Sequence, residues 1–524
     1  MHARNRTWLL GSDPVERCRQ RTLPVEGGDG STLSLDFTTG VLDPRLTFTR
    51  ASGGTYVGND GFVYGVDFAT SSSLAIGTGS KSVTLTATAG ASRRYEIGQT
   101  VYIANGANNM SGAVTAYDAS TQVLTINATS TSGSGSFTSW IVGNASARFD
   151  YDPSTTPPQP RGLLIEGSAI NYMLESNSLT GYSNSGMAVV TAGSDSNPTG
   201  IANSALQIYA TVGGTFHGYY RTITAGTNTQ VTVSIWAKAR TYTHLFLSDL
   251  ASGRAAVRFN LSTGATDNNF GAGYVSAKAT PFPNGWWRCE MVVNVTASTA
   301  YGWAFVGVPS GATLGQFGAQ YTGTGNAADG IYCYGFQVEG GSGASSYIPT
   351  GASTGSRGQD AMTMTDISSL NFNQSGGTVM MQIDGGPRDL NTFPYFAQFE
   401  KSPSGRGWGF LRMNISSTVG PRIFGTAFDN AGSVIITASN HLRPSGKIKF
   451  ATSLEPSVAR MTWVIAGGSA LVNTAAAGTL ATIGSLKFNN TTETAATDFG
   501  SVWVSQFKYW PTVLPESQMQ ALTT

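Results

Sequence analysis

Histidine and cysteine, the side chains that most often act as general bases, nucleophiles and zinc ligands, are scarce in this sequence. Four histidines and three cysteines occur in 524 residues: His2, His217, His244, His441, Cys18, Cys289 and Cys333. None of them forms a His-Glu-x-x-His or Cys-x-x-Cys motif. We therefore expect no metal site and no cofactor, and a structural calcium would rest on analogy with other β-sandwiches alone.

Paired carboxylates are the remaining catalytic possibility, because glycoside cleavage needs an acid and a base or nucleophile across the scissile bond. Asp150 and Asp152 are two residues apart and would share one face of a strand. A structural role is favoured, since an Asp beside a Pro turn commonly accepts hydrogen bonds from backbone N–H groups. We expect no enzymatic activity. Other carboxylates are expected to hold arginines structurally, namely Glu166, Glu339 and Asp360 with partners such as Arg148, Arg161 or Arg357.

Glycan binding demands less of the sequence, because an aromatic ring can stack on the apolar face of a sugar while short polar side chains bind its hydroxyls. Trp236 is the first candidate, since it would share a strand face with Ser234 and Lys238 and not with Val or Ile. His217, Tyr219 and Tyr220 form a possible rim, and Trp303, with Tyr301, a possible platform. The alternatives are that these aromatics pack in a core or are covered by a neighbouring subunit.

Composition excludes several classes of protein. Lys and Arg number 31 against 30 Asp and Glu, so the net charge is +1 and no basic face for nucleic acid is expected. No 18-residue apolar run occurs, so we expect no membrane insertion. Charged residues make up 12% and Gly 65 of 524, while aromatics reach 10%, a balance typical of folded, turn-rich β domains and not of disorder or coiled coils.

Alternating apolar and hydroxyl side chains predict strands through most of the chain, so the fold class is all-β, with tandem antiparallel sandwiches. One helix is expected near the end, with Pro515 at its first helical position. Cys289 and Cys333 could form a disulfide, but two buried thiols are favoured. The expected units are an N-terminal arm, possibly for attachment (1–31), an N-terminal β region (32–71 and 145–162), a small inserted barrel-like domain (72–144), a first sandwich (163–350), a linker (351–364) and a last sandwich (365–524).

Three segments carry a resemblance to a known family. They are Leu35–Phe37 with Leu42–Ser52; Ala147–Pro153 with Arg161–Glu166 and Asn171; and Phe336–Glu339 with Ser346–Thr350 and Arg357–Asp360. In this order they resemble a family of tailed-bacteriophage structural proteins, which includes tail fibre, tail and head-appendage proteins. The resemblance runs from about residue 33 to 365. It implies that 163–350 is a carbohydrate-binding jelly roll, that 365–524 is a concanavalin A- or laminin-G-like sandwich, and that 72–144 is an insertion.

These observations together predict a virion structural protein, a tail fibre or appendage subunit that binds bacterial surface polysaccharide. The expected partners are further copies of the chain, as a homotrimer, and other virion proteins. We expect synthesis in the host cytoplasm and display on the particle exterior. Two alternatives stay open: a purely architectural head fibre, decoration or tail protein, and a polysaccharide depolymerase tailspike.

Overall fold

The structure is a computed structural model. Its strands pair to form two β-sandwiches and a smaller sheet. Its described residues are 29–40, 42–50, 54–65, 67–70, 73–85, 97–98, 100–105, 108–118, 121–138, 140–143, 147–190, 193–213, 217–224, 226, 228–250, 255–296, 300–315, 318–386, 395–416, 420–437, 441–442, 446–475, 478–488 and 501–524. Most of the expected N-terminal arm lies outside these residues, as does Cys18.

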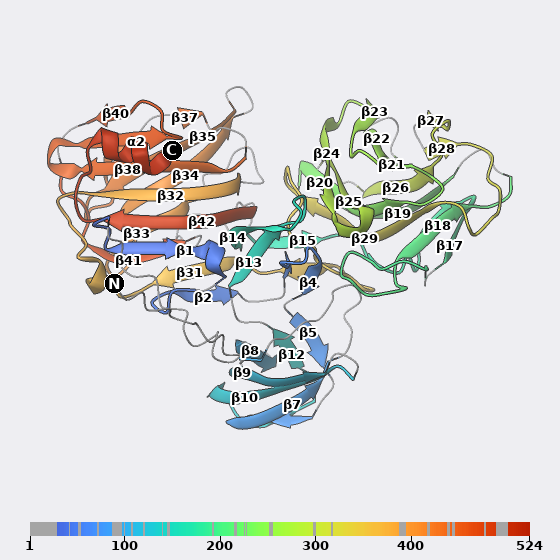
Figure 1. Ribbon diagram of the computed structural model, residues 1–524, viewed down its shortest axis with the longest axis horizontal. Helices are drawn as coiled ribbons and strands as arrows, with labels where there is room; N and C mark the ends of the chain where they lie inside the picture. Colours follow the sequence, from blue (N-terminus) through green and yellow to red (C-terminus); the bar gives the residue numbers. More distant parts are fainter. Residues whose placement is uncertain are drawn as a thin grey trace, which may run out of the picture.

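One sandwich is built from both ends of the chain (Figure 1). Its first sheet has the order β13 (Arg148–Asp152), β14 (Gln159–Glu166), β42 (Ser501–Trp510), β32 (Gly377–Gly386), β38 (Ile448–Glu455), β39 (Arg460–Ile465) and β40 (Leu471–Thr474), with β1 (Leu33–Asp36) also on β42. Its second sheet has the order β2 (Thr47–Arg50), β31 (Asp360–Met364), β41 (Ile483–Phe488), β33 (Tyr395–Lys401), β34 (Trp408–Ser416), β35 (Gly420–Phe428) and β36 (Val434–Thr437), with β37 (His441–Leu442) on β35. The segments expected as a separate N-terminal region thus complete the sheets of the C-terminal sandwich.

The other sandwich lies beside the first, drawn in green and olive in Figure 1. One six-stranded sheet has the order β16 (Ser183–Ser185), β19 (Gly218–Thr224), β26 (Ala300–Val308), β21 (His244–Asp249), β22 (Ala256–Asn260) and β23 (Thr266–Phe270). The facing sheet has the order β17 (Met187–Val190), β18 (Leu206–Ala210), β29 (Ile331–Gly340), β20 (Gln230–Ala239), β25 (Trp286–Asn294) and β24 (Tyr274–Phe282). Val231, Val233 and Ile235 point into the core between these sheets, as their alternation predicts.

The inserted unit is a third β module, drawn below the two sandwiches in Figure 1. Its sheet has the order β5 (Asp67–Thr70), β12 (Trp140–Gly143), β8 (Thr100–Asn105), β9 (Asn108–Asp118), β10 (Val123–Ser132) and β7 (Gly79–Thr84). A short pair, β6 (Leu74–Ala75) with β11 (Ser136–Phe137), flanks it. Its core includes the buried Trp140.

Short elements connect these modules. The hairpin β3 (Thr55–Val57) with β4 (Val63–Gly65) follows β2, β15 (Ala169–Asn171) pairs with β30 (Gly355–Arg357), and β27 (Thr313–Gly315) pairs with β28 (Gly318–Gln320). Residues 351–364, expected as a linker, therefore contain β30 and β31. The helix expected near the end is confirmed as α2 (Glu516–Thr523), and its buried Met519 packs on the outer face of a sheet beside Met380 and Trp510.

The all-β prediction is confirmed, and the described strand pairings are antiparallel. Cys289 and Cys333 are buried free thiols, as favoured from the sequence. They lie on β25 and β29, which pair with opposite edges of β20, so a strand separates them. Within the described part of the chain, no helix is long and apolar enough to cross a membrane.

Candidate functional site

A buried network of ion pairs lies where the chain passes from one sandwich to the other. Arg148 Nη1 lies 2.7 Å from Glu166 Oε2, and Arg148 Nη2 contacts Asp360 Oδ2. Arg357 Nη1 lies 3.4 Å from Glu166 Oε2, and Arg50 Nη1 lies 3.1 Å from Asp360 Oδ1. None of these side chains is more than 3% exposed. Residues from three distant parts of the chain, at 50, 148–166 and 357–360, therefore meet at one point.

Hydroxyl and backbone groups complete the network around Glu166. Ser346 donates from its backbone N–H to Glu166 Oε1 at 2.8 Å and from its hydroxyl to Oε2 at 2.6 Å, and the Ser501 hydroxyl donates to Oε1 at 2.6 Å. Burial alone would raise the pKa of Glu166, but Arg357 and Arg148 outweigh it and hold the pKa well below its usual value. Glu166 is thus a fully satisfied structural carboxylate.

The expectation that these carboxylates hold arginines is confirmed in part. Glu166 and Asp360 hold Arg148, and Glu166 also contacts Arg357. Glu339 acts on Arg357 electrostatically, and it accepts hydrogen bonds from the backbone N–H and the hydroxyl of Ser345, at 2.7 and 2.6 Å. The small polar residues after β29 thus satisfy buried carboxylates.

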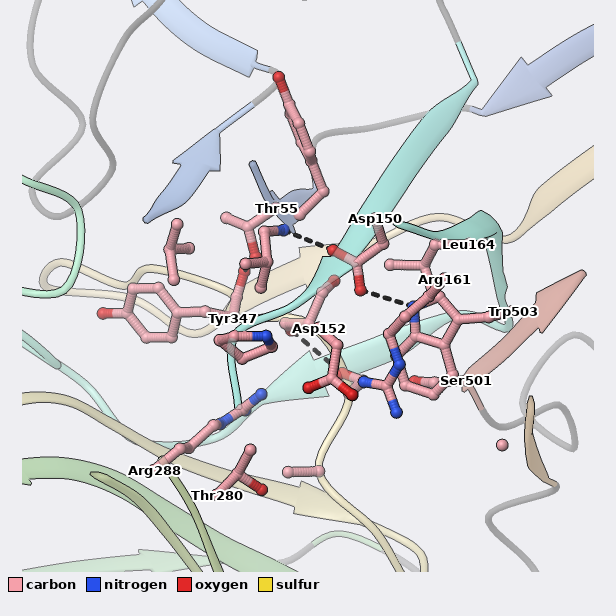
Figure 2. A pocket seen from close by; sticks show the side chains of 18 of the residues that line it. Thr55, Asp150, Asp152, Arg161, Leu164, Thr280, Arg288, Tyr347, Ser501 and Trp503 are labelled. Carbon is pink, nitrogen blue, oxygen red and sulfur yellow. Dashed lines mark hydrogen bonds between the residues drawn. The ribbon is translucent and has the colours of Figure 1, made fainter. Parts of the chain in front are cut away.

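A cavity of about 350 Å³ lies next to this network, where the two sandwiches and the β3–β4 hairpin meet. Figure 2 shows side chains from each of these parts directed toward it. The side chains that matter most for its chemistry are those of Asp150, Asp152, Arg161, Trp236, Lys278, Thr280, Arg288, Glu290, Asp384 and Trp503. The wall thus combines aromatic rings, hydroxyls and charges of both signs.

Asp150 is a deeply buried acid of the cavity wall. Its Oδ1 accepts a hydrogen bond from the Val57 backbone N–H and its Oδ2 accepts one from Trp503 Nε1, each at 2.5 Å (Figure 2). Burial raises the pKa of Asp150 to about 6, although both donors and nearby Arg161 oppose the shift. Both carboxyl oxygens are therefore engaged in holding the cavity wall together.

Arg161 reaches the cavity because β14 carries a bulge. Asp150 pairs with Gly162 and Tyr151 with Pro160, so Arg161 is the extra residue between them. Its guanidinium carbon lies 3.9 Å from the centre of the Trp503 ring, and its Nη2 lies 3.0 Å from Asp384 Oδ2. The bulge thereby turns a charged side chain toward the junction.

Arg288 and Asp152 approach the cavity from other elements. The Arg288 guanidinium lies over the Trp236 ring, 4.6 Å from its centre, and Nη2 donates to the Ser234 hydroxyl at 3.3 Å. Asp152 Oδ1 accepts hydrogen bonds from the backbone N–H and hydroxyl of Ser154, at 3.0 and 2.6 Å. In Figure 2 both charged ends are directed toward the middle of the cavity.

Of the aromatic residues proposed from the sequence, Trp236 alone lines this cavity. It does share a sheet face with Ser234 and Lys238, but that face is covered, and Trp236 is 1% exposed. Its ring packs edge-on against Phe282 and Tyr347, with centroids 5.7 and 5.4 Å apart. The expectation of an open stacking platform at Trp236 is therefore wrong, because neighbouring rings and Arg288 occupy its faces.

The remaining candidates do not form one surface. His217 is fully buried, with Nδ1 2.9 Å from the Gly186 carbonyl oxygen and Nε2 2.8 Å from that of Tyr321. Tyr219 and Trp303 lie in the core of the sandwich, whereas Tyr220 is half-buried on β19. The core alternative weighed from the sequence holds for Tyr219 and Trp303. Any sugar contact by these residues stays a prediction.

Sequence reasoning missed the residues that line the cavity with free polar atoms, above all Arg288. The signals were present in part, since Arg161 and Gly162 stand in a segment that carries the family resemblance. No group of three or more His, Cys, Asp or Glu side chains placed to hold a metal ion occurs among the described residues.

Comparison with known proteins gives little further information. No protein-family model and no curated protein matches this chain. Among solved structures, it is similar to the Ruminococcus gnavus IT-sialidase CBM40 (12% identity, 29% of this chain and 84% of that chain, TM-score 0.23). It is also similar to the binding domain of Paraclostridial Mosquitocidal Protein 1 (15%, 31% and 40%, TM-score 0.25) and the receptor binding domain of botulinum neurotoxin C/D mosaic serotype (12%, 31% and 40%, TM-score 0.24). At such TM-scores, the function of the cavity rests on its own residues.

Proposed function

We propose that this chain is a non-enzymatic structural subunit of a tailed-bacteriophage particle, a tail fibre or appendage protein that adheres to bacterial surface polysaccharide. The observation that carries the adhesive role is the junction cavity. Its hydroxyl, carboxylate and guanidinium groups are the donors and acceptors that sugar hydroxyls require, and its volume lies within the range of small-ligand pockets, roughly 300–1,000 Å³.

The virion role is supported by the resemblance to phage structural proteins together with the placement of the shared segments. Arg148, Glu166, Arg357 and Asp360 all belong to those segments, and they form the ion-pair network between the sandwiches. In this proposal the shared segments serve to join the modules. Several copies on one particle, as in a homotrimer, would convert weak binding of single sugars into avid attachment.

The hydrogen bonds and ion pairs of the cavity acids support the non-enzymatic role in this proposal. A glycosidase needs two carboxyl groups free to reach the scissile bond. Asp150 is occupied by the Val57 N–H and Trp503 Nε1–H groups, and Asp384 is paired with Arg161. Glu290 accepts a hydrogen bond from the Ala344 backbone N–H and lies 3.5 Å from Lys278 Nζ, so Asp152 has no unengaged carboxyl group beside it.

The test is to incubate the purified full chain with a panel of bacterial cells and their extracted polysaccharides. We expect saturable binding to at least one polysaccharide and no release of reducing ends on long incubation. Release of reducing ends would favour the depolymerase alternative. Particle reconstruction should place the chain's density on the exterior, and its absence from particles would contradict the virion role.

The architectural alternative is favoured by one observation, the complete burial of Trp236, Trp303 and Tyr219, which leaves these aromatic residues unavailable as open platforms. A chain that assembles with capsid or tail proteins but binds no cell or polysaccharide would support it. Saturable polysaccharide binding would exclude it.

A further inference from the structure

The charges that line the junction cavity are not all paired with one another. Arg161 Nη2 lies 3.0 Å from Asp384, and Lys278 Nζ lies 3.5 Å from Glu290 Oε2. Glu166 is neutralised by the buried arginines of the network. Among the described residues, Arg288 is the cation of the wall for which no ion-pair partner lies within 4 Å, and Asp150 and Asp152 are the anions. Both oxygens of Asp150 accept hydrogen bonds from N–H groups, whereas Asp152 is held at Oδ1 alone.

Arg288 is held ready to bind an anion. The Trp236 ring beneath it and the Ser234 hydroxyl fix the guanidinium. Its Nε is buried without a hydrogen-bond acceptor, and within the described part of the chain its Nη1 also lacks one. A guanidinium that is partly removed from water and lacks acceptors is unfavourable, and a ligand carboxylate would supply them, since the two groups match in geometry.

Asp152 supplies the complementary acceptor. Ser154 holds its Oδ1 through two hydrogen bonds, which fixes the carboxylate, while Oδ2 has no donor among the described residues. In Figure 2 this carboxylate lies between the ends of Arg288 and Arg161. A free carboxylate oxygen so placed can accept hydrogen bonds from ligand hydroxyls, but it would repel a doubly charged phosphate more strongly than a singly charged carboxylate.

We propose that the junction cavity binds one sugar residue that carries a single carboxylate, with that carboxylate on Arg288 and a hydroxyl group on Asp152. This inference rests on the proposed glycan-binding function and names its ligand class. The volume of about 350 Å³ suits a single terminal or branch residue and not a long stretch of polysaccharide. A neutral sugar would leave the Arg288 charge uncompensated.

The experiment compares uronate-containing bacterial polysaccharides with their carboxyl-reduced forms, in which each carboxylate becomes a hydroxymethyl group. We expect the full chain to bind an acidic polysaccharide and to lose roughly tenfold or more of its affinity after reduction, the effect of removing one charged hydrogen-bonded pair of about 1.5–3 kcal/mol. Sodium glucuronate should compete for the site more effectively than inorganic phosphate.

The matched variants are Arg288→Gln and Arg240→Gln. Arg240 also lies over an aromatic ring of the same sandwich, 5.7 Å from the centre of Tyr332, but it does not line the cavity. We expect Arg288→Gln to abolish the preference for the acidic form and Arg240→Gln to retain it, with thermal unfolding checking the fold of each. If Arg288→Gln fails to fold, the carboxyl-reduced probe on the natural chain still decides the question.

Three outcomes would overturn the inference, and they differ in what they leave standing. Equal binding of acidic and reduced forms would exclude the carboxylate contact while the proposed glycan-binding function stands. Competition by phosphate but not glucuronate would assign the site to phosphorylated glycans. Failure of the chain to bind any polysaccharide of the panel, in either form, would contradict the proposed function and this inference together.

Discussion

Arg148 and Glu166 form an ion pair from which solvent is completely excluded, with Arg148 Nη1 2.7 Å from Glu166 Oε2. They lie on the adjacent strands β13 and β14, and the same pair is bound by Asp360 and Arg357 from nearly 200 residues later in the chain. The pair therefore links β13 and β14, which precede the second sandwich in the chain, to the segments of Arg357 and Asp360, which follow it.

Replacing Arg148 with Met should destabilise the chain strongly. The change leaves Glu166 and Asp360 buried without their main cation, and removal of one partner of a buried pair typically costs about 3–5 kcal/mol. Denaturant unfolding followed by tryptophan fluorescence would measure the loss. Arg460→Ala is the control, because Arg460 is 47% exposed in its pair with Glu455 and such surface pairs contribute about 1 kcal/mol or less. Equal effects of the two changes would contradict the role of the network.

Stability should fall on acidification through the titration of Glu166. Its pKa in the folded chain lies below the ordinary value of 4.5, so the folded state binds this proton more weakly than the unfolded state. The stabilisation is fully present above about pH 4.5 and is lost as the pH falls toward the folded-state pKa. Melting temperatures measured from pH 6 to pH 3 should drop steeply for the natural chain and less steeply for Glu166→Gln. Parallel curves would show that Glu166 is not responsible.

The contribution of Asp150 to stability should change with pH in the opposite direction to that of Glu166. Burial raises its pKa to about 6, above the ordinary 3.8, so protonation favours the folded state between these two values. The melting temperature of the natural chain relative to Asp150→Asn should therefore rise as the pH is lowered from 6.5 to 4. A difference that stays constant over this range would mean that Asp150 titrates normally.

Gly162→Ala should destabilise the β14 bulge. Gly162 has φ +103°, and a Cβ there would lie 2.4 Å from the Val504 carbonyl oxygen on β42. The control is Gly432→Ala, because Gly432 also has positive φ, +84°, but nothing within 4 Å of a Cβ. Both changes carry the conformational cost of positive φ. The Gly162→Ala change should lower the free energy of unfolding by roughly a further 1–3 kcal/mol, because the added Cβ overpacks the contact. Thermal unfolding of the two variants would show whether the close contact has this effect.

Trp236→Ala should act mainly on stability. The sequence alone predicts an exposed sugar contact whose loss weakens adsorption without affecting assembly. In the structure the ring is buried among Phe282, Tyr334 and Tyr347. Its truncation should therefore lower the free energy of unfolding by about 3–5 kcal/mol. A variant with an unchanged melting temperature but reduced cell binding would support the original expectation instead.

Much of the architecture could be predicted from the sequence by itself. Alternation of apolar and polar residues is a local property with a period of two, and it correctly indicated strands such as β20 and β42 and an all-β fold. The helix after Pro515 and the structural role of Glu166 and Asp360 were also within reach, because proline conformation and carboxylate–arginine pairing need little knowledge of distant contacts.

Tertiary structure alone decided which face of a strand is open and which charges remain unpaired. Alternation places Trp236 on the polar side of β20, but whether that side meets water depends on Phe282, Tyr347 and Arg288, which come from other elements. The cavity likewise exists only where the two sandwiches meet, and the pairing of Arg161 with Asp384, 223 residues away, has no local signal. Burial and charge compensation depend on every segment that packs nearby, and therefore cannot be derived from local periodicity.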